Sequence, residues 1–157
     1  MYNLDDLYTL LENVNDPEVP ILSILDLGIV RNIEIINDSI EISITPTYSG
    51  CPAMNTIKTN ILLEFHTAGY YQVQVNEILS PAWTTDWMSD IGKQKLQQYG
   101  IAPPQYNTKD NKDFENIICP ICKSNHTTMI SQFGSTSCKS LFKCNSCLEP
   151  FDYFKCH

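Results

Sequence analysis

Cys119-Pro120-Ile121-Cys122 and Cys144-Asn145-Ser146-Cys147 are the two stretches that decide how the end of this chain folds. Each stretch places two residues between a pair of cysteines, and 21 residues separate the two pairs. A tight turn of this length points both sulfur atoms of a pair at one ion, so two such turns joined by a hairpin make a tetrahedral site of four thiolates. The spacing therefore predicts that Cys119, Cys122, Cys144 and Cys147 bind one metal ion.

The metal that this pattern predicts is a structural Zn²⁺, because four protein ligands leave no open coordination position for a substrate. We expect a zinc-ribbon module over residues 114–157, which are too few to fold without the free energy of metal binding. A rubredoxin-like iron site or an iron–sulfur cluster uses the same thiolates, so iron stays an alternative. Other cysteine and histidine side chains of the module lie outside the pair spacing and are spare ligands: Cys138, Cys156, His126 and His157.

Composition limits the partners of the chain. Its 157 residues include 18 acidic and 10 basic ones, and the formal net charge of −8 is unevenly distributed. Residues 1–102 carry a net charge of −9, whereas residues 103–157 carry +1. Because neither part offers a basic stripe, we expect that the protein does not bind nucleic acid.

The cellular compartment can also be predicted from the sequence. The N-terminus has neither the charged nor the apolar region of a signal peptide, and no apolar run approaches the ~18 residues of a membrane span. We therefore expect a cytoplasmic protein that does not associate with membranes. In that reducing compartment, an odd count of seven cysteines predicts metal ligands and reactive thiols rather than disulfides.

Residues 1–102 have the hydrophobic patterns of a small α+β domain in the order α-β-β-α-β-α. Ile40, Ile42 and Ile44 alternate with polar residues, as in a half-buried strand, and Asn37-Asp38 before them suits a two-residue hairpin turn. The expected strands of a three-stranded sheet are residues 29–36, 39–46 and 72–78, and the expected helices are residues 3–15, 52–68 and 85–99, the last capped by Thr85. A polar linker over residues 103–113 leads to the ribbon.

Cys51 is the residue outside the metal module that is placed to carry chemistry. It follows the second expected strand and precedes a helix that Pro52 opens, so its thiol should lie beside unpaired backbone N–H groups and the positive end of the helix dipole. Both would lower its pKa and raise its reactivity. A buried structural cysteine fits the same placement, so both interpretations stay open.

Asp16, Glu18 and Asp26 are acidic residues in loops near the ends of the expected strands. Their positions favour a role as turn or cap residues over a chemical role. His66 lies late in its helix and is expected to be a surface or core residue.

Three stretches of the chain resemble a known family. Asp16-Pro17-Glu18-Val19-Pro20, Ile24 to Val30 (ILDLGIV) and Thr47 to Ala53 (TYSGCPA) resemble the metal–sulfur cluster assembly (MIP-type) family over residues 1–102. Trp83 to Trp87 (WTTDW) and the tail from Phe133 to Phe151 narrow the resemblance to the D subunits of bacterial phenylacetyl-CoA 1,2-epoxidase systems.

This resemblance implies an accessory, non-catalytic role in aerobic phenylacetate catabolism, namely the assembly or maturation of an iron or iron–sulfur metallocentre. It implies that Cys51 is the family's reactive thiol, which holds a transient iron or cluster, with Asp16, Glu18 and Asp26 in the motif loops. Implied partners are the iron–sulfur reductase or the di-iron catalytic subunit, and one cysteine per chain suits a homodimer. A structural scaffold subunit and a Cys51-dependent CoA-thioester hydrolase are the alternatives, although the sequence shows neither a base nor an oxyanion hole by pattern.

Overall fold

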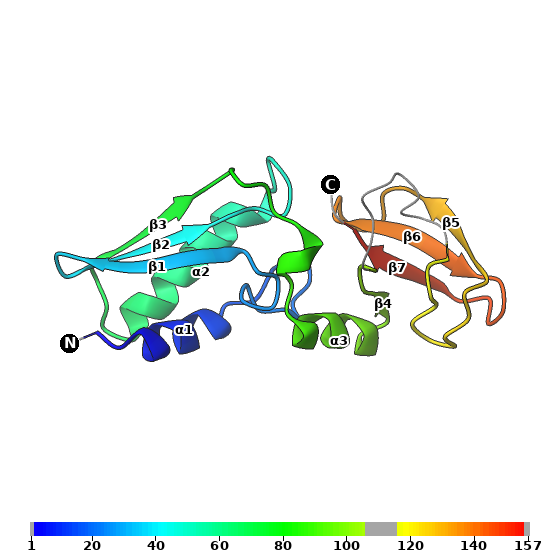
Figure 1. Ribbon diagram of the computed structural model, residues 1–157, viewed down its shortest axis with the longest axis horizontal. Helices are drawn as coiled ribbons and strands as arrows, with labels where there is room; N and C mark the ends of the chain where they lie inside the picture. The colour runs from blue at the N-terminus through cyan, green and yellow to red at the C-terminus, as the bar shows by residue number, and fades with distance from the viewer. Residues whose placement is uncertain (1, 106–115, 156–157) are drawn as a thin grey trace. The chain divides into compact units, whose positions relative to one another are not determined.

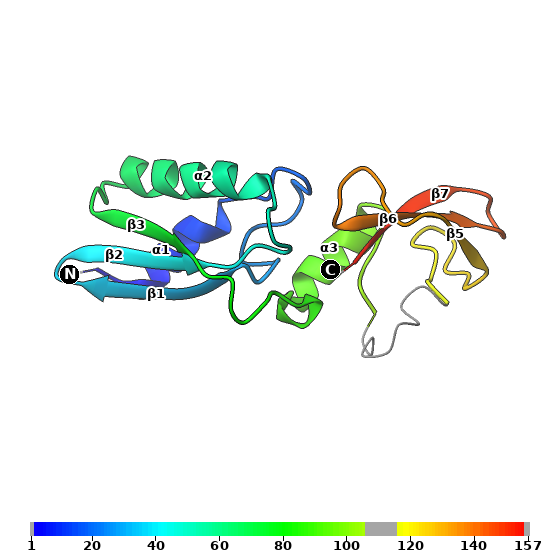
Figure 2. The same cartoon turned by 90° about the horizontal axis from the view of Figure 1, so that it is seen from above.

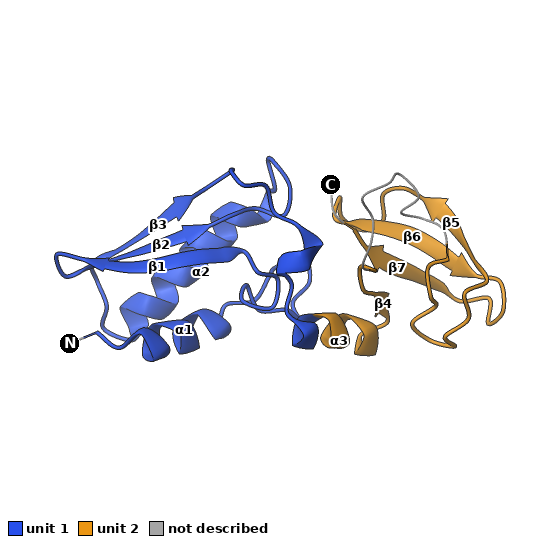
Figure 3. Ribbon diagram, viewed as in Figure 1, with its two compact units in different colours: residues 1–92 blue, residues 93–157 orange. Residues whose placement is uncertain are grey.

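The computed structural model describes residues 2–105 and 116–155, which belong to two compact units, residues 1–92 and 93–157 (Figure 3). The expected linker beyond Gln105, the expected start of the ribbon at residue 114, and the spare ligands Cys156 and His157 lie outside the described residues. In the described ranges, no helix combines the length and the apolar character needed to cross a membrane.

The first unit is the predicted α+β domain with a three-stranded sheet. In chain order its elements are α1 (Leu4–Glu12), β1 (Val30–Ile36), β2 (Ser39–Ile44), α2 (Ala53–Thr67), β3 (Val73–Glu77) and the 3-10 helix η1 (Thr85–Trp87). The strand order is β1-β2-β3, in which β1 and β2 are antiparallel and β2 and β3 are parallel. Both helices, α1 and α2, cover one face of this sheet (Figures 1 and 2).

Local sequence signals explain these elements. The Asn3 side chain accepts a hydrogen bond from the Asp5 backbone N–H and so caps α1, as a residue of this type does at a helix start. Asn37 and Asp38 have positive φ angles of 49° and 64°, the conformation of a two-residue type I′ hairpin turn. The buried isoleucines of β2 then face the helices and pack with apolar side chains of α1 and α2, including Leu7, Leu11, Ile57, Ile61 and Phe65.

The segment after β3 departs from the expected continuous helix. The cap is Thr84 rather than Thr85, and it opens only the short η1, after which Met88 is extended and α3 begins separately at Asp90 (Asp90–Gln98). The interruption has a tertiary cause, because the Ser89 N–H donates to the Asp26 carbonyl at 2.9 Å. Ser89 Oγ then accepts from the Gly92 N–H at 2.9 Å, which gives α3 its own cap.

The second unit contains a four-stranded sheet of order β4-β7-β6-β5. Its strands are β4 (Ile101–Ala102), β5 (Thr127–Ser131), β6 (Lys139–Cys144) and β7 (Pro150–Phe154). Phe142, Phe151 and Tyr153 belong to its core, where the Phe142 ring centroid lies 5.9 Å from that of Phe151 and 5.8 Å from that of Tyr153. The units divide after residue 92, earlier than the expected domain end at residue 102, because Ile101 and Ala102 pair with β7 and so join the second unit's sheet.

Candidate functional site

The four predicted metal ligands converge at one end of the second unit's sheet. Cys144 ends β6 and Cys147 lies in the turn that follows, while Cys119 and Cys122 belong to the turn before β5. Their four sulfur atoms all lie within 4.8 Å of one another, and they are the one such group of metal-binding side chains in the described ranges. The described spare ligands Cys138 and His126 stand outside this group.

The sulfur geometry fits a tetrahedral metal ion. Sγ of Cys119 is 3.8 Å from Sγ of Cys147, and Sγ of Cys122 is 3.5 Å from Sγ of Cys144. A tetrahedron with metal–sulfur bonds of about 2.3 Å has sulfur–sulfur edges of about 3.8 Å, whereas a disulfide bond is about 2.05 Å long. The four cysteines could therefore hold one metal ion, and their geometry suits Zn²⁺ and iron alike.

The electrostatics of the four sulfurs point to the same conclusion. The backbone N–H of Cys147 is the main cause that lowers the pKa of Cys144 to about 6. The backbone N–H of Glu149 stabilises the Cys147 thiolate, but burial and the three neighbouring sulfurs outweigh it and raise the pKa of Cys147 to about 12. Four thiolates cannot ionise side by side without a cation, so the arrangement is one that a bound metal ion would stabilise.

Cys51 lies in the turn between β2 and α2, as its sequence position predicts. Gly50 has a φ of 78°, and the Cys51 N–H donates to the Tyr48 carbonyl at 3.2 Å, which closes the turn. The Met54 N–H donates to the Cys51 carbonyl at 3.3 Å as α2 begins. The thiol is half-buried, so it is neither a core side chain nor fully open to solvent.

The expectation that the helix start lowers the pKa of Cys51 is wrong. Burial is the largest influence and raises the pKa of the thiol; the backbone N–H of Ala53 and the Tyr48 hydroxyl act against it. The negative charges of Glu18 and Asp16 raise the pKa further, so the net change is upward from the ordinary value. The thiol therefore keeps its proton to a higher pH than a free cysteine does.

The three acidic residues have different surroundings. Asp16 is buried, and its Oδ1 accepts from the backbone N–H groups of Glu18 and Val19 at 2.7 and 2.8 Å, so it closes the loop that carries Glu18. Through their charges, Asp16 and Glu18 belong to the surroundings of Cys51. Asp26 instead accepts from the Ser23 N–H and from the Ser89 hydroxyl, which is a structural role.

The motif Asp26-Leu27-Gly28 fixes the segment after β3. In addition to the Asp26 contacts, the Trp83 indole N–H donates to the Leu27 carbonyl at 2.8 Å. Gly28, with a φ of 70°, lies so close to Trp87 that a Cβ atom would meet the Trp87 carbonyl oxygen at 2.1 Å. These contacts were not predicted from the sequence. Gly28 and Trp83 are 55 residues apart, and no local sequence pattern indicates that the two segments meet.

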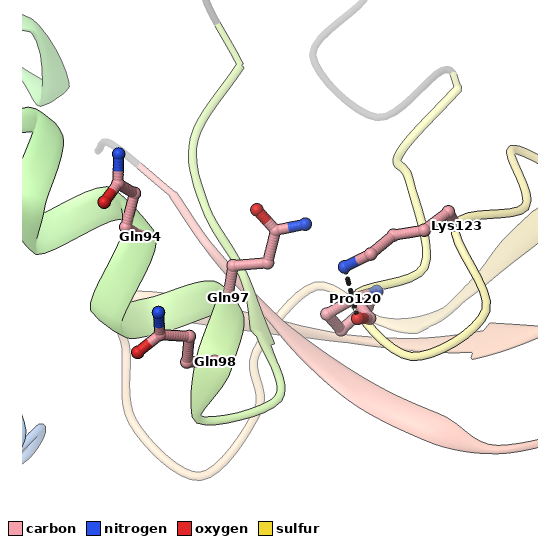
Figure 4. Close-up of a pocket in the computed structure, with 5 residues that line it drawn as sticks. All are labelled: Gln94, Gln97, Gln98, Pro120 and Lys123. Carbon is pink, nitrogen blue, oxygen red and sulfur yellow. Dashed lines mark hydrogen bonds between the residues drawn. The ribbon is translucent and has the colours of Figure 1, made fainter.

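A shallow pocket in the second unit holds no part of the candidate site. Its lining consists of Gln94, Gln97 and Gln98 of α3 together with Pro120 and Lys123, and the Lys123 ammonium donates to the Pro120 carbonyl at 2.7 Å (Figure 4). These amides and one ammonium supply neither a nucleophile nor a metal ligand.

Comparisons with protein families match each part of the chain separately. Residues 4–61 match the family described as "Iron-sulfur cluster assembly protein", and residues 103–155 match the "PaaD zinc beta ribbon domain". Among curated proteins, the chain is 48% identical over 151 residues to the D subunit of the "Putative 1,2-phenylacetyl-CoA epoxidase" of Escherichia coli strain K12. This alignment covers 96% of the chain and 92% of the relative.

Two solved structures resemble the N-terminal part. A domain of unknown function, DUF59, from Bacillus anthracis is 30% identical with a TM-score of 0.55, and it covers 59% of this chain and 89% of its own. The conserved hypothetical protein TM0487 from Thermotoga maritima is 27% identical with a TM-score of 0.52, and it covers 60% of this chain and 94% of its own.

Proposed function

The chain belongs to the family of 1,2-phenylacetyl-CoA epoxidase D subunits, and from this premise we propose that it is an accessory factor that assembles or matures a metallocentre of the epoxidase complex in phenylacetate catabolism. It binds an iron ion or an iron–sulfur cluster transiently at Cys51 and passes it to an epoxidase subunit. The client is the iron–sulfur reductase or the di-iron subunit. The protein has no catalytic turnover of its own.

The observation that carries this proposal is the contrast between two thiol environments in one chain. Cys119, Cys122, Cys144 and Cys147 enclose a four-sulfur site, which would retain a bound metal because it has no open coordination position. Cys51 is a half-buried thiol in a turn and offers one sulfur only. A metal held by one protein sulfur keeps positions for ligands from a client or a second copy, so it can be handed over.

The ribbon has a supporting part in this function. Its four cysteines would hold Zn²⁺, and the bound ion would supply no chemistry beyond neutralising the thiolates and stabilising the fold. The N–H of Cys147 donates toward Cys144 Sγ at 3.5 Å and stabilises the charged ligand. The surrounding aromatic core, Phe142, Phe151 and Tyr153, fixes the strands that carry the ligands.

The charges near Cys51 support the binding of a cation. Burial is the main cause that disfavours the Cys51 thiolate, and the negative charges of Glu18 and Asp16 add to it, so a positive ion bound at the sulfur would favour loss of the proton. The same surroundings oppose a hydrolase that uses Cys51 as a nucleophile, because a nucleophilic cysteine needs a lowered pKa.

The test is metal and acid-labile sulfide content of protein purified without oxygen, for the native chain, Cys51→Ser and the control Ser49→Ala in the same turn. We expect about one zinc per chain in all three proteins. Iron, with or without sulfide, should appear in the native chain and Ser49→Ala and be lost in Cys51→Ser. If iron persists in Cys51→Ser, the ribbon is the iron site, and this result would overturn the proposal.

A second experiment measures epoxidase activity in cells that lack the native copy of this protein and express one of the variants. Cys51→Ser should fail to restore epoxidase activity, whereas Ser49→Ala should restore it. A Cys51→Ser protein that gives full activity and stays bound to the epoxidase would instead establish a scaffold subunit.

A further inference from the structure

The sheet of the first unit has one face that α1 and α2 leave uncovered (Figures 1 and 2). Its register arranges polar side chains in two rows that cross all three strands. One row is Glu34, Glu41 and Gln74, and the other is Asn32, Ser43 and Asn76. We call these six residues the open face. Glu41 and Ser43 on the central strand are half-buried by their neighbours, and the other four are exposed.

The open face is acidic and contains no basic side chain. Glu34 and Glu41 are direct partners across the antiparallel pair of β1 and β2, so their Cβ atoms lie about 5 Å apart. The Asn32 amide donates to Glu34 at 2.8 Å and relieves part of the repulsion. Like charges directly opposite one another still destabilise a sheet. The free protein therefore keeps an unfavourable pair on an uncovered surface.

The rest of the first unit does not supply a compensating charge. Residues 1–92 contain thirteen acidic residues and two basic ones, Arg31 and Lys58. The Arg31 guanidinium lies 3.6 Å from the centre of the Trp87 ring, and Lys58 forms an ion pair with Glu77 at 2.7 Å. Both cations are therefore engaged elsewhere, and the described residues of the first unit offer Glu34 and Glu41 no compensating cation.

We propose that the open face is the surface on which a protein partner docks, and that this partner presents closely spaced lysine and arginine side chains to Glu34 and Glu41. A guanidinium or ammonium group can bridge two carboxylates at this spacing. The amides of Asn32, Gln74 and Asn76 are hydrogen-bonding groups for the rim of such an interface.

The charge of the first unit selects this occupant over others. Nucleic acid and anionic lipid surfaces would be repelled by a unit with this excess of carboxylates. A second copy of this chain is a poorer match, because both copies carry a formal net charge of −8 and would repel each other. A flat sheet face with charged and amide side chains also suits a protein surface better than a small ligand, which binds in a concave site.

This inference rests on the proposed function, because it identifies how an epoxidase subunit would be recognised. The experiment measures binding of the purified reductase and di-iron subunits from the same organism to the full chain. The variants are Glu41→Gln and Glu41→Lys, and Glu12→Gln on α1 is the control with the same loss of charge. Cys51→Ser is included because it leaves the open face intact.

We expect Glu41→Gln to weaken binding of one subunit at least tenfold and Glu41→Lys to weaken it further, while Glu12→Gln and Cys51→Ser bind like the native chain. Thermal unfolding separates docking from a structural role, because removing the repulsion should leave the unfolding midpoint of Glu41→Gln unchanged or higher. Native affinity in Glu41→Lys, self-association in place of subunit binding, or no binding of either subunit would overturn the inference. The proposed function is tested separately, because restoration of epoxidase activity by Cys51→Ser in cells does not depend on Glu41. Full restoration would contradict the proposed function and leave the docking surface untouched.

Discussion

Replacement of Gly28 with alanine tests how firmly the first unit holds the segment that follows β3. A Cβ atom on Gly28 would lie 2.1 Å from the carbonyl oxygen of Trp87 and 2.6 Å from its carbonyl carbon. The φ of 70° costs an alanine about 1–2 kcal/mol relative to glycine, and an extra methyl group in a packed contact costs about 1–3 kcal/mol. Because the clashing atoms are backbone and cannot rotate away, we expect Gly28→Ala to lower the free energy of unfolding by about 2–5 kcal/mol.

Gly69→Ala is the matched control for this measurement. Gly69 also has a positive φ, 92°, but a Cβ atom there would meet nothing within 4 Å, so only the backbone cost of about 1–2 kcal/mol applies. The chain has two tryptophans, Trp83 and Trp87, and both belong to the first unit, so tryptophan fluorescence in urea follows that unit alone. Equal unfolding midpoints for the two variants would refute the reasoning, because the Trp87 contact would then cost nothing.

Three further predictions concern the thiols and Asp26. At neutral pH, Cys51 should react with iodoacetamide more slowly than a free cysteine, because its raised pKa leaves less thiolate. Glu18→Gln should speed this reaction, which is followed by mass spectrometry of the peptide that contains Cys51. An unchanged or slower rate in Glu18→Gln would contradict the effect of the Glu18 charge on the thiol. Removal of the metal by a chelator should abolish the protection of backbone amides from hydrogen exchange in β6 and β7. Tryptophan fluorescence, which reports on the first unit, should stay constant. Protection that persists in the metal-free protein would show that the ribbon folds without metal. Asp26→Ala should destabilise the first unit by about 1–3 kcal/mol because the buried Ser23 N–H loses its acceptor, and the exposed change Glu12→Ala should stay within about 0.5 kcal/mol.

The parts of the fold that the sequence predicted are those set by short-range rules. The convergence of the four cysteines follows from two local spacings, because each turn of two intervening residues orients its own pair of sulfurs. The hairpin at Asn37 and Asp38 likewise depends on residues that tolerate a positive φ. Tertiary contacts decided the cases in which prediction failed. The interruption of the last helix before Asp90 depends on the Asp26 carbonyl, which lies more than sixty residues earlier in the sequence.

The pKa of Cys51 is the most instructive failure of this kind. Its helix start was predicted correctly, and the backbone N–H of Ala53 does stabilise the thiolate. Burial and two carboxylates, from Asp16 and Glu18, nevertheless outweigh that effect. Those carboxylates are more than thirty residues away in sequence, so only the folded chain brings their charges to the thiol.

A raised pKa is an advantage for a thiol that has to wait for its cargo. A protonated sulfur is a poor nucleophile and is oxidised slowly, so Cys51 would survive between deliveries in a cell that uses oxygen. An arriving metal cation would reverse the balance, because its charge offsets Glu18 and Asp16 and displaces the proton. Cys144 has the opposite arrangement, in which backbone N–H groups lower its pKa to about 6 and favour the thiolate. Under the proposed function, one chain thus uses cysteine in two ways. Metal binding is permanent where backbone N–H groups favour the thiolate, as at Cys144, and reversible where burial and nearby negative charges disfavour it, as at Cys51.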